Sequence, residues 1–340
     1  MNRPFRVGIT RDFLAEDGTL SYGDIGLSIF DETPNLEFTF LEKNTAEILS
    51  EQIHGYDGLL VLSPNLTVAS LKNNPQLRIV ARFGVGYDSV DVEACTRNGT
   101  LLTITPNAVR RPVAVSALTF LLSLSHKLLK KDRLTRSGNW NQRLAHMGQG
   151  LSHRTLGVIG VGNIGKEVFR MAKHLDMNFI GYDPYTKQES VDDLEVQMRS
   201  LDEVMSEADY LVVCCTLVPE THHLIDAKRL SLMKSSAYII NVSRGPVIDQ
   251  TALYKALADN QIQGAGLDVF EEEPIDPADP LLALENVILA PHALCWTDQF
   301  FEAIGYEACQ SIANVATGRR PEGIVNEAAL KHTSNTDLKK

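Results

Sequence analysis

The sequence predicts an α/β protein with two Rossmann-like domains, in which a doubly wound parallel sheet domain is inserted into a second, flavodoxin-like domain. Short apolar runs alternate with helical stretches in two successive series, which is the pattern of parallel sheets. The second series opens with a glycine-rich turn between a strand and a helix, as a doubly wound sheet does. A chain of 340 residues is long enough for two domains with separate cores.

The first series is predicted to form one parallel sheet with its covering helices. Its strands are expected at Arg6–Thr10, Leu36–Leu41, Gly58–Leu62, Arg78–Arg82 and Thr100–Thr103. Its helices are expected at Thr45–Ile53, Leu66–Asn73 and Val90–Arg97. We place the domain boundaries after residues 106 and 294, so that the outer domain comprises 1–106 and 295–340 and the inserted domain 107–294.

An apolar helix from Pro112 to Leu129 is predicted to lead into the second series, with proline in its first turn. Because its faces are apolar nearly all round, we expect it to be buried between domains or subunits. Further strands are predicted at Thr155–Ile159, Asn178–Tyr182, Tyr210–Cys214, Ala237–Asn241, Gly264–Leu267 and Val287–Leu289. Further helices are predicted at Ile164–Leu175, Leu201–Ala208, Gln250–Asp259 and Phe300–Ala316, before Ile324–Asn326 returns to the first domain.

Composition excludes several classes of partner and location. The net charge of −11 argues against nucleic acid or an anionic membrane as a main partner. The chain has five cysteines, an odd number, and their spacing is not that of metal ligands. This predicts free thiols and a reducing compartment. With no signal peptide and no apolar window as long as a transmembrane helix, we expect a cytoplasmic protein.

The segment Leu156–Gly165 contains the G-x-G-x-x-G pattern of dinucleotide-binding turns, formed by Gly160, Gly162 and Gly165. Its glycines would allow a tight turn, let the backbone approach a pyrophosphate and let the helix pack on the strand. Asp183 follows the next predicted strand, where a carboxylate would bind ribose hydroxyls and repel a 2′-phosphate. The pattern therefore predicts NAD rather than NADP, the alternative being a plain strand–turn–helix connection.

Three later segments end predicted strands, at the edge where an open α/β sheet binds its ligand. Arg244 precedes a glycine and could present its guanidinium to a carboxylate, although a surface salt bridge is the simpler interpretation. Asp268 and Glu273 follow another strand, and His292 a third. A histidine beside a carboxylate forms an acid/base pair, because the carboxylate orients the imidazole and stabilises its protonated form.

The order of these motifs resembles the D-isomer-specific 2-hydroxyacid dehydrogenase family over almost the whole chain, in particular its phosphoglycerate dehydrogenase and hydroxypyruvate/glyoxylate reductase-like members. The matching motifs are the glycine fingerprint, Asp183, Ser243-Arg244-Gly245, Asp268-Val269-Phe270 with Glu273-Pro274, Pro291-His292, Phe83–Asp88 and Thr105-Pro106. The resemblance implies NAD-dependent hydride transfer between the nicotinamide and a D-2-hydroxy acid or 2-keto acid. It makes 107–294 the NAD-binding domain and the flanking segments the substrate domain.

The resemblance also implies roles for single residues. Arg244, Glu273 and His292 would be catalytic: Arg244 would bind the substrate carboxylate, and His292, tuned by Glu273, would protonate the keto oxygen during hydride transfer. The backbone of Val85 and Gly86 would hold the other side of that carboxylate. The cofactor would be bound by the three glycines, by the backbone of Asn163 and Ile164, and by Asp183, Thr216 and Asp268, the last at the nicotinamide carboxamide. No metal site is expected, because adjacent His222 and His223 side chains diverge.

The chain departs from the pattern of the family at three places, one of them a pair of adjacent arginines. Trp296 stands where small residues are common and could wall the substrate pocket or pack at the domain hinge. Arg110 and Arg111 lie near the expected start of the apolar helix, where cations are unfavourable. They could bind a second anionic or strongly polar group of the substrate, or form an interdomain salt bridge or a solvated helix N-terminus. Thr216 replaces a frequent proline.

Two rival functions remain open from the sequence. A phosphite-type dehydrogenase would keep the same three catalytic residues, whereas Glu273 argues against a formate dehydrogenase, which has glutamine there. A non-catalytic, NAD-sensing scaffold similar to the C-terminal-binding-protein corepressors shares the fold. The usual assembly of the family implies a homodimer through the NAD-binding domains, for which the helix from Pro112 and the segment Gly138–Gly150 could supply the interface.

Overall fold

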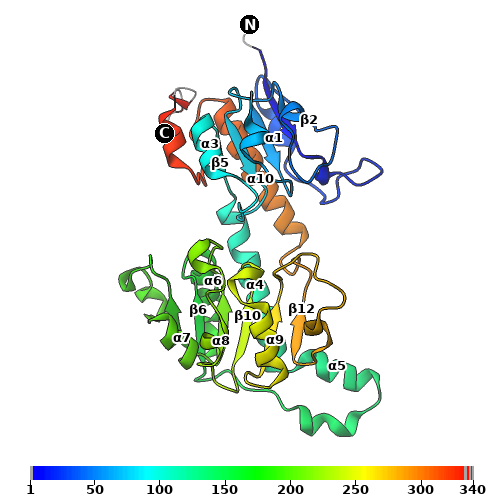
Figure 1. Cartoon of the computed structure of the whole chain (residues 1–340), viewed down its shortest axis with the longest axis vertical. Helices are drawn as coiled ribbons and strands as arrows, with labels where there is room; N and C mark the ends of the chain where they lie inside the picture. The colour runs from blue at the N-terminus through cyan, green and yellow to red at the C-terminus, as the bar shows by residue number, and fades with distance from the viewer. Residues whose placement is uncertain (1–2, 333–334, 337, 339–340) are drawn as a thin grey trace. The chain divides into compact units, whose positions relative to one another are not determined.

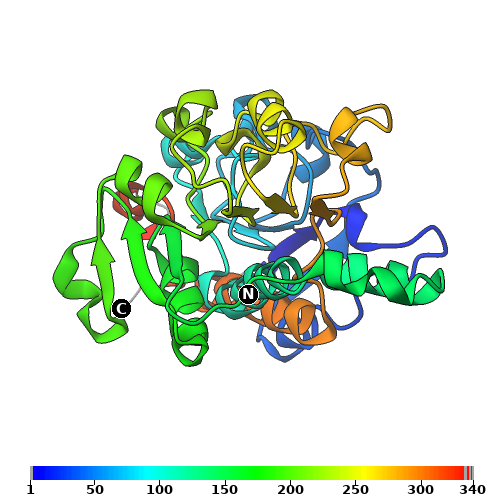
Figure 2. The same cartoon turned by 90° about the horizontal axis from the view of Figure 1, so that it is seen from below.

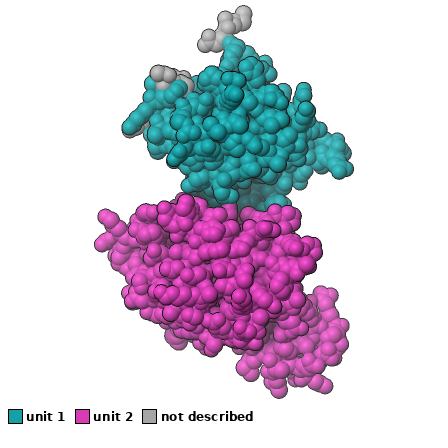
Figure 3. Space-filling view, in the orientation of Figure 1, with its two compact units in different colours: residues 1–109, 296–340 teal, residues 110–295 magenta. Residues whose placement is uncertain are grey.

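The fold places two parallel sheets in two separate units of the chain. The structure is a computed structural model that describes residues 3–332, 335–336 and 338. Unit 1 comprises residues 1–109 and 296–340, and unit 2 comprises residues 110–295 (Figure 3). Each unit has a sheet and a hydrophobic core of its own.

Unit 1 is built on a five-stranded sheet in the order β2-β1-β3-β4-β5, in which every pair of neighbours is parallel. This is the strand order 2-1-3-4-5 of flavodoxin-like domains, the class of fold that the sequence predicts for this part of the chain. The strands are β1 (Phe5–Ile9), β2 (Leu36–Phe40), β3 (Gly58–Val61), β4 (Ile79–Arg82) and β5 (Leu101–Thr103). The helices are α1 (Ser28–Glu32), α2 (Val68–Leu71), α3 (Val92–Asn98) and α10 (Asp298–Ala316).

The C-terminal segment completes unit 1. Helix α10 packs on β3 and β4 and against α1. Ile324 then forms an antiparallel bridge with Thr103 at the end of β5, and Asn326 accepts a hydrogen bond from the N–H of Leu102 at 2.8 Å. Residues far apart in sequence therefore close this sheet (Figure 1).

Unit 2 contains a seven-stranded sheet in the order β12-β11-β10-β9-β6-β7-β8, again parallel throughout. The strands are β6 (Thr155–Ile159), β7 (Asn178–Tyr182), β8 (Val196–Met198), β9 (Tyr210–Val213), β10 (Tyr238–Asn241), β11 (Gly264–Leu267) and β12 (Val287–Leu289). The chain leaves β6 for β7 on one side and later returns to β9 on its other side. This reversal is the switch point at which doubly wound sheets bind dinucleotides.

Helices cover both faces of the seven-stranded sheet. They are α6 (Asn163–Ala172), α7 (Leu201–Glu207), α8 (Ala227–Leu230), α9 (Gln250–Ala258) and α4 (Pro106–Ser125), of which residues 110–125 belong to unit 2. One core lies under α7, α8 and α9, and the other under α4 and α6. A side chain at Gly266 would run into Phe120 of α4, so this glycine lets the helix lie against β11.

Helix α5 (Leu128–Arg136) and the 3₁₀ segment Trp140–His146 project from the body of unit 2, as Figures 1 and 2 show. The structure gives no buried residue in either of them. Their exposed apolar side chains, with those of α4, are Val115, Leu122, Leu128, Leu129, Trp140, Leu144 and Met147. We call this set the projecting apolar surface.

Three local predictions are wrong. The stretch predicted as a helix at Thr45–Ile53 is extended at its start, because Ala46 and Ile48 exchange backbone hydrogen bonds with Asn65, and only Ser50–Ile53 forms a 3₁₀ turn. The short edge strand β8 is not predicted from the sequence, since its three residues give too brief an apolar pattern. Helix α4 begins at Pro106 rather than Pro112 and ends at Ser125 rather than Leu129, which puts Pro112 inside it.

The early start of α4 has a visible cause. The Glu307 carboxylate accepts hydrogen bonds from the backbone N–H groups of Asn107 and Ala108, so the first turn is satisfied by a side chain from α10.

Among the described residues, α4 is also long and apolar enough to cross a membrane, with half of the tested stretch buried in the structure. The expectation that no window reaches this length is therefore wrong, although a buried core helix passes the same test.

Candidate active site and cofactor site

The three glycines of the fingerprint have different surroundings. Gly160 has φ +93°, and a Cβ there would lie 2.5 Å from the backbone nitrogen of Cys215. A Cβ at Gly165 would collide with the carbonyl oxygen of Gly160. A Cβ at Gly162 would meet no atom within 4 Å. The first and third glycines are therefore needed by the fold itself, whereas the second keeps an open surface clear.

That open surface lies at the start of helix α6. Gly162 is the N-cap residue and has no side chain with which to cap the first turn, which begins at Asn163 and Ile164. Unpaired N–H groups at a helix N-terminus attract anions, and the helix dipole adds to this attraction. These residues fit the pyrophosphate of a dinucleotide.

Asp183 lies directly after β7, the strand that pairs with β6, and β6 leads into the glycine turn. Its Oδ1 accepts hydrogen bonds from the N–H groups of Tyr185 at 2.8 Å and Thr186 at 3.1 Å, which fix the half-buried carboxylate. The Thr186 hydroxyl donates to the carbonyl of Val161 at 3.1 Å and so ties this segment to the turn. The predicted partner of the ribose hydroxyls is thus held beside the predicted pyrophosphate site.

Thr216 follows β9, the other neighbour of β6. Its side chain is exposed, and its carbonyl accepts a hydrogen bond from the Thr221 hydroxyl at 2.7 Å. This bond closes the loop that leaves the sheet at its cofactor edge.

Arg244 lies in the loop after β10, and the side chain of Asn241 forms hydrogen bonds with the backbone of this loop. The Asn241 amide donates to the Arg244 carbonyl at 3.0 Å, and its oxygen accepts from the N–H of Ser243. The guanidinium is half-buried and donates from Nη1 to the carbonyl of Ser243 at 2.8 Å. Gly245 is required here, because a Cβ would collide with the backbone of Phe270. The Arg244 loop therefore lies directly against the start of the loop that carries Glu273.

Glu273 and His292, which the sequence predicts as an acid/base pair, lie in hydrogen-bond contact. Glu273 Oε2 lies 2.6 Å from His292 Nδ1, while Oε1 accepts the N–H of Phe270 at 3.0 Å. Burial by itself would raise the pKa of the Glu273 carboxyl, but the hydrogen bonds from His292 and Phe270 and the charges of His292 and Arg244 together lower it. The imidazole is left with Nε2 directed away from the carboxylate and its ring partly exposed.

Asp268 supports the segment after His292 from the end of β11. Its Oδ1 accepts the backbone N–H groups of Ala293 at 3.0 Å and Leu294 at 3.2 Å. Burial raises the pKa of the Asp268 carboxyl, although these two hydrogen bonds and the nearby His292 act in the opposite direction. The structure therefore gives Asp268 a place beside the acid/base pair, and its contact with the carboxamide stays a prediction.

In unit 1, the glycine loop Phe83–Asp88 follows β4. Gly84 has φ +132°, and its carbonyl accepts the N–H of Thr105 at 3.0 Å. Arg82 donates to the carbonyl of Phe83 at 2.7 Å. These bonds hold the turn that leads into Val85 and Gly86, the residues predicted to bind the substrate carboxylate through their backbone.

Trp296 packs within unit 1 on an aromatic cluster. Its ring lies 5.8 Å from Tyr22 and 5.2 Å from Phe301, both edge to face, and Phe301 stacks at 6.3 Å on Phe83. The indole is still 49% exposed. The cluster therefore extends from the predicted carboxylate loop to an accessible tryptophan face.

Arg110 and Arg111 lie well inside α4 and not at its start, because the helix begins four residues before Arg110. Arg111 Nη1 lies 3.2 Å from the buried Glu167 carboxylate, and Arg110 Nε lies 3.7 Å from it. These contacts lie within unit 2, so the two arginines form a salt bridge, but not the interdomain one that the sequence leaves open. Binding of substrate by Arg111 stays a prediction.

The expectation that the His222 and His223 side chains diverge is wrong, because their rings stack with centroids 4.1 Å apart. Within the ranges that the structure describes, no group of three or more His, Cys, Asp or Glu side chains could hold a metal ion. His223 instead pairs through Nε2 with Glu271 at 2.7 Å. Sequence reasoning missed this pair, because only the pairing of the strands shows that the two residues meet.

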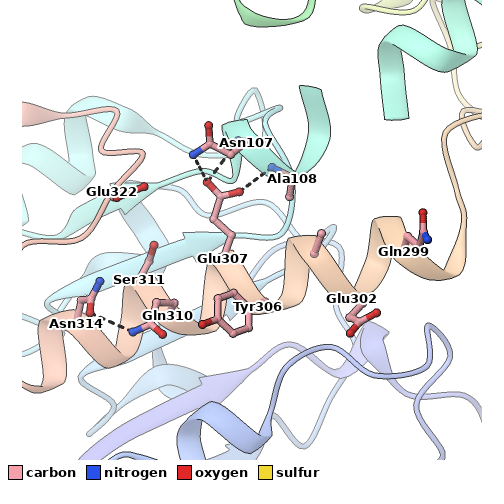
Figure 4. A pocket seen from close by; sticks show the side chains of 11 residues that line it. Asn107, Ala108, Gln299, Glu302, Tyr306, Glu307, Gln310, Ser311, Asn314 and Glu322 are labelled. Atoms are coloured by element: carbon pink, nitrogen blue, oxygen red, sulfur yellow. Dashed lines mark hydrogen bonds between the residues drawn. The ribbon is translucent and has the colours of Figure 1, made fainter. Parts of the chain in front are cut away.

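A hollow of about 610 Å³ lies in unit 1 along α10 (Figure 4). Glu307 reaches across it to the start of α4, and Tyr306 lines the same side. Burial raises the pKa of the Glu307 carboxyl, against the effect of the hydrogen bonds from Ala108 and Asn107. None of the predicted site residues lines this hollow.

A doubly wound sheet with a glycine turn at its switch point, and a glutamate–histidine contact at the same edge, are features of dinucleotide-dependent oxidoreductases. Residues 118–293 match the family described as D-isomer specific 2-hydroxyacid dehydrogenase, NAD binding domain. The chain belongs to this family. It is accordingly an NAD-dependent enzyme that acts on hydroxy and keto acids.

Named relatives agree with this class. A glyoxylate reductase of Thermococcus gammatolerans is 38% identical over 84% of this chain and 87% of its own length. A D-3-phosphoglycerate dehydrogenase of Methanocaldococcus jannaschii is 37% identical over 83% of this chain, which covers 54% of that protein. The solved D-lactate dehydrogenase of Aquifex aeolicus, in complex with NAD and lactic acid, superposes with a TM-score of 0.80 at 28% identity, over 92% of this chain and 96% of the other.

Proposed function

We propose that the protein reduces a small 2-keto acid to the D-2-hydroxy acid and runs the reverse oxidation, with Arg244, Glu273 and His292 as its catalytic residues. The observation that carries this proposal is the 2.6 Å contact between Glu273 Oε2 and His292 Nδ1, in which Glu273 belongs to a loop that lies directly against the Arg244 loop. Glyoxylate is the first substrate to test, because relatives that are 34–38% identical and are matched over 87–94% of their own length are named glyoxylate reductases.

NAD, when bound, supplies or accepts the hydride at its nicotinamide. Gly162, Asn163 and Ile164 would hold its pyrophosphate and Asp183 its ribose hydroxyls, and Thr216 and Asp268 would lie toward the nicotinamide. In reduction, His292 donates a proton from Nε2 to the keto oxygen as negative charge develops there. Glu273 stabilises the protonated ring through Nδ1.

Arg244 is assigned to the substrate carboxylate and to the polarised keto oxygen, since its planar guanidinium can donate two parallel hydrogen bonds. In unit 1, the backbone N–H groups of Val85 and Gly86 are assigned to the same carboxylate. Trp296 is assigned to the substrate side chain, because its exposed face is joined to that loop through Phe301 and Phe83.

NADH oxidation at 340 nm tests the proposal across glyoxylate, hydroxypyruvate, phosphohydroxypyruvate, pyruvate, 2-ketoglutarate and oxaloacetate, with NADPH in parallel. We expect turnover with NADH on at least one acid, lost in Arg244→Ala. Silence on every acid together with tight NADH binding would contradict the proposal and favour a non-catalytic NAD sensor. Turnover of phosphite alone would favour the phosphite-type alternative.

We also propose that the protein is a homodimer through unit 2. The projecting apolar surface supports this, since monomers rarely expose so many large apolar side chains on adjoining elements. Light scattering at micromolar concentration should give twice the mass of 37.6 kDa, and Leu144→Asp should lower it. A monomeric mass for the wild type would contradict the dimer.

A cytoplasmic location stays a prediction, with which the five free thiols agree.

A further inference from the structure

His223 lies at the meeting point of three loops that leave the sheet of unit 2 at its cofactor edge. It follows the β9 loop that contains Thr216. Its N–H donates to the carbonyl of Pro246 at 2.7 Å, two residues after Arg244. Its Nε2 lies 2.7 Å from Oε1 of Glu271, two residues before Glu273. One residue therefore contacts both loops that carry proposed catalytic residues.

Glu271 is tied in turn to helix α9. Its Oε1 also accepts the N–H of Gln250 at 3.1 Å, and its own N–H donates to the Gln250 side-chain oxygen at 3.0 Å. The Gln250 amide donates to Asp279 at 2.7 Å. The Glu271 carboxylate is thus held in place from the helix, so the His223 imidazole bonds to a fixed acceptor.

The backbone at His223 is part of this arrangement. His223 has φ +49°, in the left-handed region that residues other than glycine and asparagine seldom adopt. This conformation lets the N–H and the imidazole of one residue reach two different loops. The neighbouring His222 stacks on His223 at 4.1 Å, and its side chain is exposed.

We propose that His223 and Glu271 are positioning residues, which hold the Arg244 loop and the Glu273 loop in the relative position needed for keto-acid reduction. The inference rests on the proposed function of Arg244, Glu273 and His292. Neither residue touches the reacting atoms. Their effect follows from geometry, because a displacement of about 1 Å in a catalytic group can cost about 100-fold in rate.

His223→Asn is the variant that tests this, since asparagine accepts a left-handed backbone but is too short to replace the imidazole bond. We expect kcat/KM for the best keto acid of the panel to fall about tenfold, with most of the loss in kcat. The Kd for NADH should stay within about twofold, because the bonds that hold the glycine turn and Asp183 do not involve this pair. His153→Asn, the same substitution at another histidine that is exposed and has a left-handed backbone (φ +62°), should behave as wild type.

Rescue separates positioning from simple stability. Glu271→Gln keeps an oxygen that can accept from Gln250 and His223, so it should retain most activity, whereas Glu271→Ala should lose as much as His223→Asn. The double variant His223→Asn with Glu271→Ala should be no worse than Glu271→Ala alone. Independent, additive losses in the double variant would overturn the proposal.

Deuterium exchange provides a readout that does not depend on activity. In His223→Asn we expect faster exchange in peptides covering Ser243–Ile248 and Phe270–Glu273, whose N–H groups are bonded within these loops. Unchanged exchange in both peptides, or kcat/KM within twofold of wild type, would overturn the inference. If the wild type reduced no keto acid while exchange changed as expected, the proposed function would fail and the structural link would stand.

Discussion

The two glycine loops of the molecule occupy equivalent places but lead into different structure. Both come directly after a parallel strand, the loop Phe83–Asp88 after β4 and the turn Gly160–Gly165 after β6. The turn in unit 2 runs straight into helix α6, and two of its three glycines are packed against backbone. The loop in unit 1 starts no helix, and a Cβ at Gly84 would only approach the end of Arg82 at 3.9 Å.

The difference shows that glycines serve two purposes at such loops. Gly160 and Gly165 are glycines because there is no space for a side chain. Gly84 is a glycine because of its backbone angle, and Gly162 because the surface in front of it is left open. A helix start offers several parallel N–H groups and suits a pyrophosphate, whereas a short loop offers few and suits a single carboxylate. The same residue type therefore fits the two different ligands that we propose.

The largest effect is expected from Gly165→Ala, which sharpens the contrast between packed and open glycines. The added methyl would collide with the Gly160 carbonyl and separate α6 from β6. We expect a loss of stability of about 1–3 kcal/mol or more, from overpacking in the core. Urea unfolding of the variant measures it, and a midpoint equal to that of the wild type would contradict the assignment.

Gly162→Ala is the matched control for that variant. Because a Cβ at this position meets no protein atom, stability should change by less than about 0.5 kcal/mol. The methyl would instead stand where the pyrophosphate is proposed, so the Kd for NADH should rise about tenfold by fluorescence titration. If NADH bound as tightly as to wild type, the proposed position of the pyrophosphate would be wrong.

Gly84→Ala tests the loop in unit 1. An alanine Cβ at this position would have enough space, but alanine rarely adopts the backbone angle φ +132°. The resulting strain of about 1–3 kcal/mol should distort the loop or lower the stability of the protein. We expect a higher KM for the keto acid with an unchanged Kd for NADH. A variant whose NADH affinity fell while its KM stayed constant would reverse the roles of the two loops.

A smaller effect is expected from Trp296→Ala. Removing the exposed indole should raise KM for keto acids with larger side chains by several-fold and leave glyoxylate nearly unaffected, because glyoxylate has no side chain to contact it. Steady-state kinetics on glyoxylate and on a bulkier acid give the ratio. An equal change for both acids would show that Trp296 only supports the packing of Tyr22 and Phe301.

The smallest effect concerns acid stability. The folded-state pKa of Glu273 is lowered from its ordinary 4.5, so its contribution to stability is present above pH 4.5 and is lost as the pH falls through the lower, folded value. The difference in Tm between wild type and Glu273→Gln should therefore shrink on going from pH 6 to pH 3. A difference that grew toward low pH would contradict the direction of the shift.

The elements with strong local patterns could be predicted from the sequence. Thr155–Ile159 and Gly264–Leu267 are strands over the predicted residues, because each is a buried apolar run next to glycine or turn signals. The segment from Thr45 could not be predicted, since its pairing with Asn65 is a tertiary contact that overrides local helix preference. Pro112 was misleading for a related reason, because a side chain from the distant α10 satisfies an earlier helix start at Pro106.

The candidate site divides in the same way. Arg244, Glu273 and His292 are predicted from motifs that follow strands in a recognisable order, and the structure brings Glu273 and His292 into contact. His223 and Glu271 could not be identified, because they are 48 residues apart and meet only through strand order and a left-handed backbone. Sequence motifs thus indicated the groups proposed to do the chemistry, but not the contacts that hold their loops together.

The most direct test of the central claim is the rate of keto-acid reduction by His292→Ala, measured together with its Kd for NADH. General acid catalysis contributes about 10²–10⁴-fold, so kcat should fall by roughly that factor while NADH binds as in wild type. Such a result would establish His292 as the proton donor on an intact cofactor site. A kcat within about twofold of wild type would contradict this role, because the pair with Glu273 would then have no part in the chemistry.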